Sequence, residues 1–450
     1  MNRNILIAGG FLAVLAIGTT VVRLTSKRLE WTTSSPEALA EFQKGLEARE
    51  KIYYDEARLH FSKAVDLDPN FLMAKYFLMA FMGASSGDPK ADKLFKELEK
   101  GDSSRLTDRE RFLLAYAIAN HNKDTGAAEK TLTAYAAKHP DDPYALERQT
   151  AIATERQEWP EAHRLLTRSI EVAPNRVLAY NQLGYLEMGQ GRFAEAEKMF
   201  ETYRYIAPDQ ANPHDSLGEL YILLGRYEAA RKELEAALTI KPDFCAPYEH
   251  LVSLALMEGK VNEAEQALAR ADRTSPCNVA LDKKIPCLIA VCQPLFAGDW
   301  EGVWKALQTS CPGVDEDGDP LQIWVALRAG RRTEADAIEK KAHERLAKMA
   351  ASEPGRAHME ALVAHIEGAR FLLDGEAGKA AERFRFADHL LSYRDLPTGL
   401  MKLFNRFVLA QALEASGARD EAATVLASAR AVNASFVDRL NALVATPAAP

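Results

Sequence analysis

The prolines in the central part of the chain recur at a fixed interval. Five of them stand 34 residues apart, at Pro140, Pro174, Pro208, Pro242 and Pro276. An alanine stands twelve positions before each of the last four, at Ala162, Ala196, Ala230 and Ala264. A large apolar residue stands eight positions before each, at Leu166, Phe200, Leu234 and Leu268. Apolar side chains between these positions follow a helical period and no segment alternates with period two, so the pattern predicts helices and no sheet.

Each 34-residue unit is predicted to contain two helices, A and B. Small residues such as Gly184 and Ala196 are expected to let helix A approach helix B, while Phe200 fills the seam to the next unit. The proline after helix B cannot continue the helix and sets the turn. Gly191 and Gly225 fall at the A–B turns, where glycine tolerates a positive φ. No unit can bury its apolar face alone, so stability is expected to come from stacking neighbours.

This pattern resembles the tetratricopeptide repeat (TPR), a 34-residue helix–turn–helix unit. The resemblance implies an all-α fold, an α-solenoid of stacked helix pairs that forms a right-handed superhelix. One further unit fits upstream from near residue 38, on Gly45, Ala57, Phe61, Ala64 and Pro69. Degenerate A–B turns follow downstream, at Gly298, Gly330, Gly375 and Gly417, which brings the total to roughly eleven pairs.

These features divide the chain into seven parts. They are a tail (1–4), an anchor or signal segment (5–22), a linker (23–35), irregular N-terminal repeats (36–140), regular repeats (141–276), degenerate pairs (277–432), and a capping helix with a disordered tail (433–450). Pro69 and Pro140 stand 71 residues apart, three more than two periods. We therefore expect a short insertion near Gly83–Lys90 or Gly101–Arg105.

An apolar stretch precedes the repeats. Residues 5–22 carry no charged side chain, and as a helix they would span about 27 Å, close to the hydrocarbon core of a bilayer. We expect a single-pass anchor, with a cleaved secretory signal ending near Ala16-Ile17-Gly18, or a buried soluble helix, as alternatives. Basic residues before and after the stretch nearly balance and slightly favour the body staying inside, whereas the signal-like segment favours the opposite.

Three short motifs carry a narrower resemblance. They are Trp31-Thr-Thr-Ser-Ser-Pro36, Arg105-Leu-Thr-Asp-Arg-Glu-Arg111 and His139-Pro-Asp-Asp-Pro143. Their order is similar to the TPR sensor segments that follow a single span in some bacterial membrane serine/threonine kinases, over about residues 31–240. The resemblance implies a membrane-tethered repeat domain outside the cytoplasm, in the periplasm. Because only about four residues precede the span, we expect no attached kinase domain.

Charge and cysteine content exclude several classes. The formal net charge is −8, which disfavours a general nucleic-acid binder because phosphate contacts need clustered positive charge. Five cysteines in 450 residues are too few for a disulfide-stapled scaffold. Outside the cytoplasm one disulfide could form among Cys277, Cys287, Cys292 and Cys311; otherwise these are small core residues, as is expected of Cys245.

Four motifs suggest chemistry, but each has a simpler interpretation. Gly83–Gly87 matches a nucleophile elbow but follows a helical pattern, and Val314–Pro320 resembles a calcium loop with the wrong residues at two required positions. His343-Glu344 lacks the second histidine of a zinc protease, and His358 and His365 have no carboxylate between them on their helix face. The sequence therefore predicts no enzyme activity, no metal and no cofactor.

The concave wall of a TPR array is lined by helix A, which implies a binding groove in the regular repeats. The groove residues are Tyr144, Glu147, Glu155, Asn181, Tyr185, Met188, Asn212, Asp215, Glu219, Ile222, Glu249 and Ser253. Five are acidic and none is basic, so the groove suits a basic or mixed peptide and disfavours a carboxylate clamp, unless it is simply a solvated acidic face. The predicted function is a membrane-tethered scaffold that binds a protein or peptide; the alternative is a structural accessory subunit of an envelope assembly, secretion or pilus complex.

Overall fold

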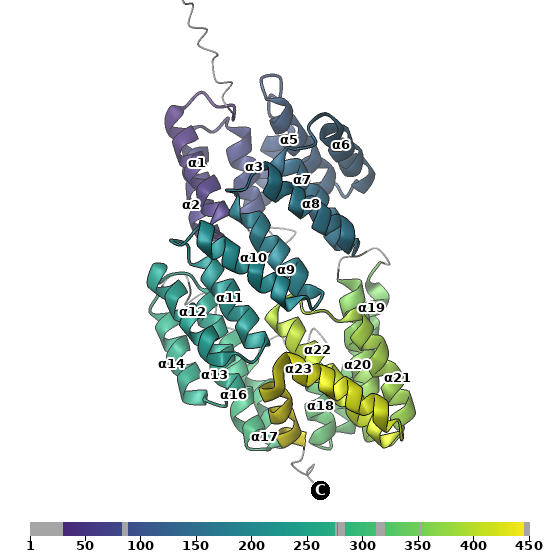
Figure 1. Cartoon of the computed structure of the whole chain (residues 1–450). Coiled ribbons are helices and arrows are strands. Elements are labelled where there is room, and N and C mark those ends of the chain that lie inside the picture. The colour runs from purple at the N-terminus through teal and green to yellow at the C-terminus, as the bar shows by residue number, and fades with distance from the viewer. Residues whose placement is uncertain are drawn as a thin grey trace, which may run out of the picture. The chain divides into compact units, whose positions relative to one another are not determined.

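The chain folds into helices that pair in sequence order. The structure, a computed structural model, describes residues 30–82, 89–274, 277, 284–311, 320–350, 353 and 355–444. These residues form 22 helices and no strand (Figure 1). The pairs are α1 (Pro36–Glu50) with α2 (Tyr54–Leu67), α3 (Leu72–Phe81) with α4 (Pro89–Glu99), α5 (Asp108–His121) with α6 (Thr125–Lys138), α7 (Pro143–Glu155) with α8 (Trp159–Val172), α9 (Val177–Gly189) with α10 (Phe193–Ile206), α11 (Asn212–Leu223) with α12 (Tyr227–Ile240), α13 (Ala246–Met257) with α14 (Val261–Asp272), α16 (Lys284–Phe296) with α17 (Trp300–Ser310), α18 (Pro320–Arg328) with α19 (Arg332–Lys348), α20 (Arg356–Leu373) with α21 (Ala377–Leu390), and α22 (Leu396–Ala415) with α23 (Arg419–Val444). The predicted fold class, an all-α solenoid of TPR-type helix pairs, is confirmed.

The helices group into two compact units. The N-terminal unit ends at Lys138, and the C-terminal unit comprises the residues from His139 onward together with Glu50–Ile52. Within the described ranges no helix is long and apolar enough to cross a membrane. The predicted span at residues 5–22 lies outside those ranges, as do Gly83–Gly87 and residues 314–319 of the calcium-like loop.

Left-handed backbone marks the turns inside the pairs. Gly191 and Gly225 have φ values of +74° and +69°, as the sequence predicts. The same conformation occurs at the degenerate turns, at Gly298, Gly330, Gly375 and Gly417. Glycine adopts this conformation without steric cost, so these glycines mark where helix A ends and helix B begins. At the α1–α2, α5–α6 and α7–α8 turns the same conformation is adopted by Ile52, Lys123 and Gln157.

Close approach of helix A to helix B depends on a second set of glycines. A Cβ atom on Gly218 would lie 2.6 Å from the Leu234 side chain, and one on Gly184 would overlap the Phe200 ring. Phe200 was expected to fill the seam between units, but its ring lies against Gly184 of its own unit. The large side chain of helix B therefore occupies the space that the missing side chain of helix A leaves open.

Aromatic side chains hold the N-terminal unit together. Trp31, which precedes α1, is 2% exposed, and its ring centroid lies 5.1 Å from that of Phe42. Phe42 in turn lies 4.8 Å from Phe71, and Phe61 stacks on Phe77 at 5.2 Å. Trp31, which lies in the predicted linker, is therefore anchored in the core of this unit.

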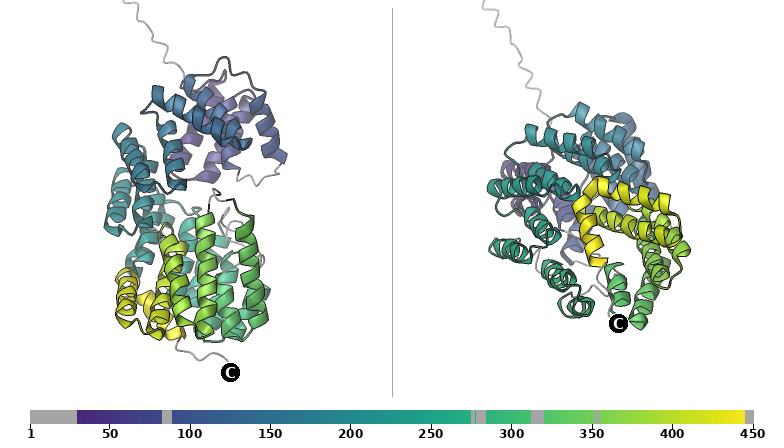
Figure 2. Two further views of the ribbon diagram at one scale, coloured as in Figure 1. Left: turned by 90° about the vertical axis from the view of Figure 1, so that its right-hand side faces the viewer. Right: turned by 60° about the horizontal axis from the view of Figure 1, so that its bottom comes forward.

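The end of the chain packs back on the regular repeats of the C-terminal unit. Helix α22 contacts α11, and α23 bends at Asn433, where φ is −148° and ψ is 90°. The Asn433 amide donates hydrogen bonds to the carbonyl oxygens of Ile222 and Leu223, at 3.1 and 3.2 Å. The yellow helices α22 and α23 thus lie beside teal helices from the middle of the chain (Figure 2). Helices α22 and α23 therefore cover part of the surface of the regular repeats.

Candidate functional site

Most of the predicted groove residues are buried. Seven of the twelve are less than 10% exposed: Tyr144, Asn181, Met188, Asn212, Asp215, Glu219 and Ile222. Tyr185, Glu147, Glu249 and Ser253 are half-buried, and Glu155 is exposed. The expectation of an open acidic groove is therefore wrong for its central part. Their partner-binding role stays a prediction, because a partner would first have to uncover them.

The central residues form one hydrogen-bonded network across α9, α11 and α13. The Tyr185 hydroxyl donates to Glu219 at 2.6 Å, and the Ser216 hydroxyl donates to the Asn181 side-chain oxygen at 3.0 Å. His250 Nδ1 lies 2.8 Å from an Asp215 carboxylate oxygen, and its Nε2 lies 3.9 Å from Glu219. The network joins four of the predicted groove residues to two that the sequence did not single out, Ser216 and His250.

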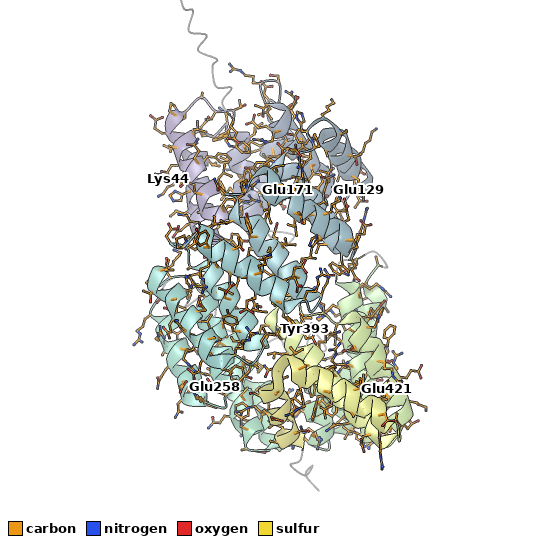
Figure 3. The ribbon with its side chains drawn as sticks, in the orientation of Figure 1. Lys44, Glu129, Glu171, Glu258, Tyr393 and Glu421 are labelled. Atoms are coloured by element: carbon orange, nitrogen blue, oxygen red, sulfur yellow. A yellow bond between two sulfur atoms is a disulfide. The ribbon has the colours of Figure 1, made fainter. Side chains whose placement is uncertain are left out.

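The chain itself covers this network. The backbone N–H of Leu396 donates to a Glu219 carboxylate oxygen at 2.7 Å, and the N–H of Tyr393 donates to the Gly189 carbonyl oxygen at 3.2 Å. The Tyr393 ring packs edge-on against Phe193, with centroids 5.2 Å apart. Tyr393 lies where the yellow C-terminal helices meet the teal repeats (Figure 3). The segment between α21 and α22 therefore occupies the place that the sequence predicted for a partner.

Burial and facing charges shift the pKa values in the network. Burial, together with the adjacent Glu219 and Asp215, raises the pKa of the Tyr185 hydroxyl well above its usual range. Burial also raises the pKa of Glu219, against the opposing effect of His250. For His250, burial alone would lower the pKa, but the facing carboxylates of Asp215 and Glu219 outweigh it and raise the pKa to about 9. His250 is thus an imidazolium that neutralises part of the buried acidic charge.

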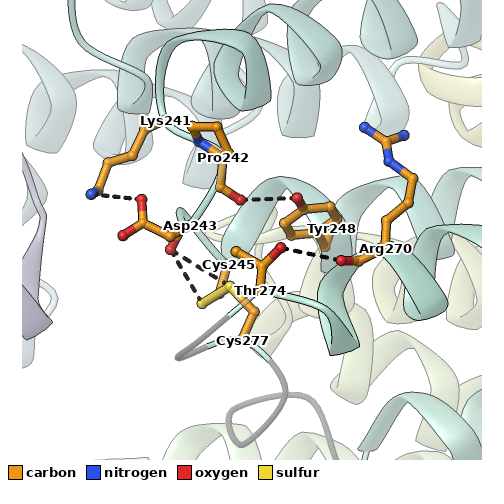
Figure 4. Close-up of a disulfide and its surroundings, with 8 residues drawn as sticks. All are labelled: Lys241, Pro242, Asp243, Cys245, Tyr248, Arg270, Thr274 and Cys277. Atoms are coloured by element: carbon orange, nitrogen blue, oxygen red, sulfur yellow. Dashed lines mark hydrogen bonds and ion pairs between the residues drawn. A yellow bond between two sulfur atoms is a disulfide. The ribbon is translucent and has the colours of Figure 1, made fainter.

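Two disulfides join helices of the C-terminal unit. Cys245 pairs with Cys277, and Cys287 pairs with Cys311, while Cys292 is free. The first bridge lies beside the turn at Lys241–Asp243, next to Tyr248, whose hydroxyl donates to the Pro242 carbonyl oxygen at 2.9 Å (Figure 4). Cys245, which was expected to be a core residue, is bridged. Repeat spacing alone could not reveal this pair, because its two cysteines come from consecutive turns after helix B.

The N-terminal unit contains a large hollow of about 1530 Å³. One wall is a face of α4, and the others come from residues 32–34, the α2–α3 turn and residues 101–108. Six basic and five acidic side chains line it: Lys75, Lys93, Lys96, Lys100, Arg105 and Arg111, with Asp68, Asp92, Glu97, Asp102 and Asp108. The hollow lies outside the predicted groove, and no repeat signature in the sequence indicated it.

Several of the carboxylates in the hollow are paired with side chains of the same unit. The Lys75 ammonium lies 2.5 Å from Glu97, and Arg111 pairs with Asp108. Asp68 accepts a hydrogen bond of 2.6 Å from the Thr33 hydroxyl. The three lysines at 93, 96 and 100 are exposed along the α4 wall, which also carries Asp92 and Glu97, and the Lys93 ammonium lies 3.9 Å from Glu97. Three lysines face two carboxylates, so the wall carries a small excess of positive charge, although the whole chain is negatively charged.

The sequence comparison agrees with the helix pairing. A tetratricopeptide repeat family model matches residues 176–243, which contain helices α9 to α12. Residues 176–243 are therefore similar to the tetratricopeptide repeat family. A search of curated proteins gives no match. The matched segment coincides with two of the four regular units that the proline spacing defines.

Solved TPR proteins resemble this chain only distantly. One is PilW, a widely conserved type IV pilus biogenesis factor, with 13% identity over 54% of this chain and 96% of that chain and a TM-score of 0.33. A TPR protein from Parabacteroides merdae ATCC 43184 has 16% identity over 68% and 98%, with a TM-score of 0.38. The Cut9–Hcn1 hetero-tetramer of the APC/C has 16% identity over 90% and 76%, with a TM-score of 0.46. Similarity at this level says nothing about what this protein binds.

One histidine cluster has the composition of a metal site. Ligand atoms of Glu339, His343 and Glu367 lie within 4.8 Å of one another. However, Arg370 pairs with Glu339 and Arg383 pairs with Glu367, so the carboxylates are already neutralised. We assign no metal to this ion-pair cluster.

The buried histidine of α20, His365, also has a structural role. Nε2 of His365 accepts from the Trp324 indole N–H at 2.9 Å, and its Nδ1 lies 2.9 Å from the Asn405 side-chain oxygen. Burial lowers the pKa of His365 to about 4, so the ring is neutral. The side chain therefore links α18, α20 and α22 in the core.

Proposed function

We propose that this TPR protein is a scaffold, without enzyme activity, that binds a protein or peptide partner in the hollow of its N-terminal unit. The observation that carries the proposal is the exposed lysine wall of this hollow, opposite the polar segment at residues 32–34. Lys93 and Lys96 belong to α4 and Lys100 directly follows it; they stand three and four residues apart, so they lie along one face. This wall favours a partner segment with acidic side chains, in place of the basic partner that the acidic groove suggested.

We also propose that residues 5–22 tether the protein to a membrane with its repeats outside the cytoplasm, in the periplasm. Two disulfides in the C-terminal unit support this location, because disulfides persist in oxidising compartments and are rare in the cytoplasm. The charge-free stretch of 18 residues is long enough to span most of a bilayer core. A tethered scaffold would hold its partner close to the membrane surface.

A second candidate function is that of a structural accessory subunit of an envelope assembly, secretion or pilus complex. The packing of α22 and α23 on the regular repeats favours this function. Because the chain's own helices cover these repeats, they form a rigid structure rather than an open groove. In that case outer surfaces would make the assembly contacts and the hollow would not be needed.

Charge reversal of the lysine wall tests the proposed binding surface. The test variant is Lys93→Glu, Lys96→Glu and Lys100→Glu. The matched control is Lys123→Glu, Lys130→Glu and Lys138→Glu, which changes the charge of the same unit equally at exposed positions outside the hollow. A fluorescent hexaglutamate peptide should bind the wild type and the control, and should bind the test variant at least tenfold more weakly.

Crosslinked capture from native membranes then separates the two functions. Proteins captured by the wild type and the control but lost from the lysine-wall variant would be partners of the hollow. Equal binding of hexaglutamate by all three proteins, together with identical captures, would refute the hollow as the binding surface. The assembly function would then be the better explanation.

A further inference from the structure

Helix α23 bends at a position where its own sequence does not require a bend. Residues 419–444 contain no proline and no glycine, which are frequent causes of sharp kinks, yet Asn433 has a non-helical φ of −148° and ψ of 90°. The two halves of α23, residues 419–432 and 434–444, run in different directions (Figure 1). Since the local sequence favours one continuous helix, contacts with other parts of the fold must hold the bend.

The Asn433 side chain supplies these contacts. Its amide donates to the carbonyl oxygens of Ile222 and Leu223, at 3.1 and 3.2 Å, in the last turn of α11. Its side-chain oxygen accepts a hydrogen bond of 2.9 Å from the Phe436 N–H and so caps the first turn of the terminal half. The Tyr227 hydroxyl donates to the same oxygen at 3.4 Å. One side chain therefore starts the terminal half and fastens the bend to the repeats.

The terminal half lies across the A–B turns of successive helix pairs. A Cβ atom on Gly225 would lie 2.7 Å from the side-chain oxygen of Asn433, and one on Gly259 would lie 2.6 Å from a side-chain nitrogen of Arg439. The Arg439 guanidinium lies over the Phe296 ring of α16, 5.2 Å from its centroid. We call the surface formed by Gly225, Gly259 and Phe296 the turn-edge seat. It is separate from the predicted groove.

An apolar stripe of the terminal half packs on the core of the C-terminal unit. Val437 and Leu440 are 0% and 8% exposed, and Phe436 packs against the same core. If the bend straightened, residues 434–444 would continue α23 and extend about 16 Å beyond its first half. The stripe and the turn-edge seat would then both lose their partner, which is unfavourable for apolar side chains in water.

We propose that two copies of this chain exchange residues 434–444, so that the terminal half of each copy occupies the turn-edge seat of the other. The exchange re-forms the contacts of Val437, Leu440 and Arg439 between the copies, so it needs no new complementary surface, and the reciprocal contact closes a two-fold dimer. It also lets α23 become the continuous helix that its sequence favours. This inference does not depend on the lysine wall, which belongs to the N-terminal unit.

A variant that straightens the bend tests the exchange. Asn433→Ala removes the side chain that holds the bend and introduces the residue with the highest helix propensity. Asn441→Ala is the matched control, because it makes the same substitution at an exposed position of the terminal half. Sedimentation equilibrium of the full-length protein in detergent measures the dimer dissociation constant. We expect Asn433→Ala to dimerise at least tenfold more tightly than the wild type and the control. Equal dissociation constants for the two variants would overturn the proposal.

A second substitution identifies the surface that makes the dimer. Val437→Asp places a charge in the fully buried part of the stripe, so the double variant Asn433→Ala/Val437→Asp should lose the gain in dimerisation. If the double variant dimerises as tightly as Asn433→Ala, the copies associate through a different surface and the exchange is refuted.

Hydrogen exchange in the unmodified protein decides the question even if Asn433→Ala does not fold. In a dilute sample the amide protons of residues 434–444 should exchange at least tenfold faster than those of residues 420–432, because the terminal half opens separately at Asn433. Raising the protein concentration about a hundredfold should slow the exchange of residues 434–444, because a second copy then covers them. Exchange of these amides at the same rate in both samples would show that no second copy takes up the terminal half, and would overturn the proposal.

Discussion

The Glu110 carboxylate accepts hydrogen bonds from both the backbone N–H and the hydroxyl of Thr32, each at 2.6 Å, although the two residues are 78 positions apart. Glu110 is fully buried and also accepts from the Thr107 N–H at 2.8 Å, which completes the capping box of α5. It thus ties the segment before the first repeat to the start of the third pair. Thr32 and Thr107 both line the hollow, so this contact also shapes the proposed binding surface.

Removing this carboxylate should loosen residues 32–34, which line the hollow. We expect Glu110→Ala to destabilise the N-terminal unit by about 3 kcal/mol, because three partly buried donors would lose their acceptor. The amide proton of Thr32 should then exchange much faster, and the melting temperature should fall. Glu99→Ala, at an exposed position on α4, is the matched control. Unchanged exchange at Thr32 in the Glu110 variant would show that the contact does not hold the segment.

The sequence indicated the two motifs that make this contact, but it did not predict that they contact each other. It singled out the motifs that contain Thr32 and Glu110 and left them separate, because nothing in a repeat pattern tells which loops meet. The helix pairing was predictable because the 34-residue period, the turn glycines and the prolines act locally. The return of α22 onto α11 was not, because it depends on how curvature accumulates over many repeats. The burial of the predicted groove residues could therefore not be foreseen.

Overpacking between helices A and B should be costly at Gly184. We expect Gly184→Leu to destabilise the C-terminal unit by roughly 1–3 kcal/mol, because the new side chain would meet the Phe200 ring. Gly378→Leu is the control, since nothing lies within 4 Å of a Cβ atom at that helical position. Thermal unfolding followed by circular dichroism measures both. A melting temperature for the Gly184 variant equal to that of the wild type would contradict the packing described here.

The disulfides make a prediction that thiol chemistry can check. The unreduced protein, denatured in urea, should contain one reactive thiol, from Cys292, and the reduced protein should contain five. Each bridge closes a loop of moderate length, with sequence separations of 32 and 24, and should contribute roughly 3 kcal/mol. Reduction should therefore lower the melting temperature. Five reactive thiols in protein isolated without reductant would contradict both bridges and weaken the proposed location outside the cytoplasm.

The buried imidazolium of His250 makes stability depend on pH. Its pKa rises from about 6.5 in the unfolded chain to about 9 in the fold, because Asp215 and Glu219 outweigh the effect of burial. A raised folded-state pKa means that the stabilising contribution is fully present below pH 6.5 and is lost as the pH rises through 9. At 1.36 kcal/mol per pKa unit, the free energy of unfolding should fall by about 3 kcal/mol over this window, as measured by urea unfolding.

His250→Gln should lower the stability below pH 6.5 and remove most of this dependence, whereas His389→Gln, at an exposed position, should preserve it. If the wild type and the His250 variant lose stability in parallel between pH 6.5 and 9, His250 is not charged in the fold, and the acidic network must be neutralised by protonation of its carboxylates.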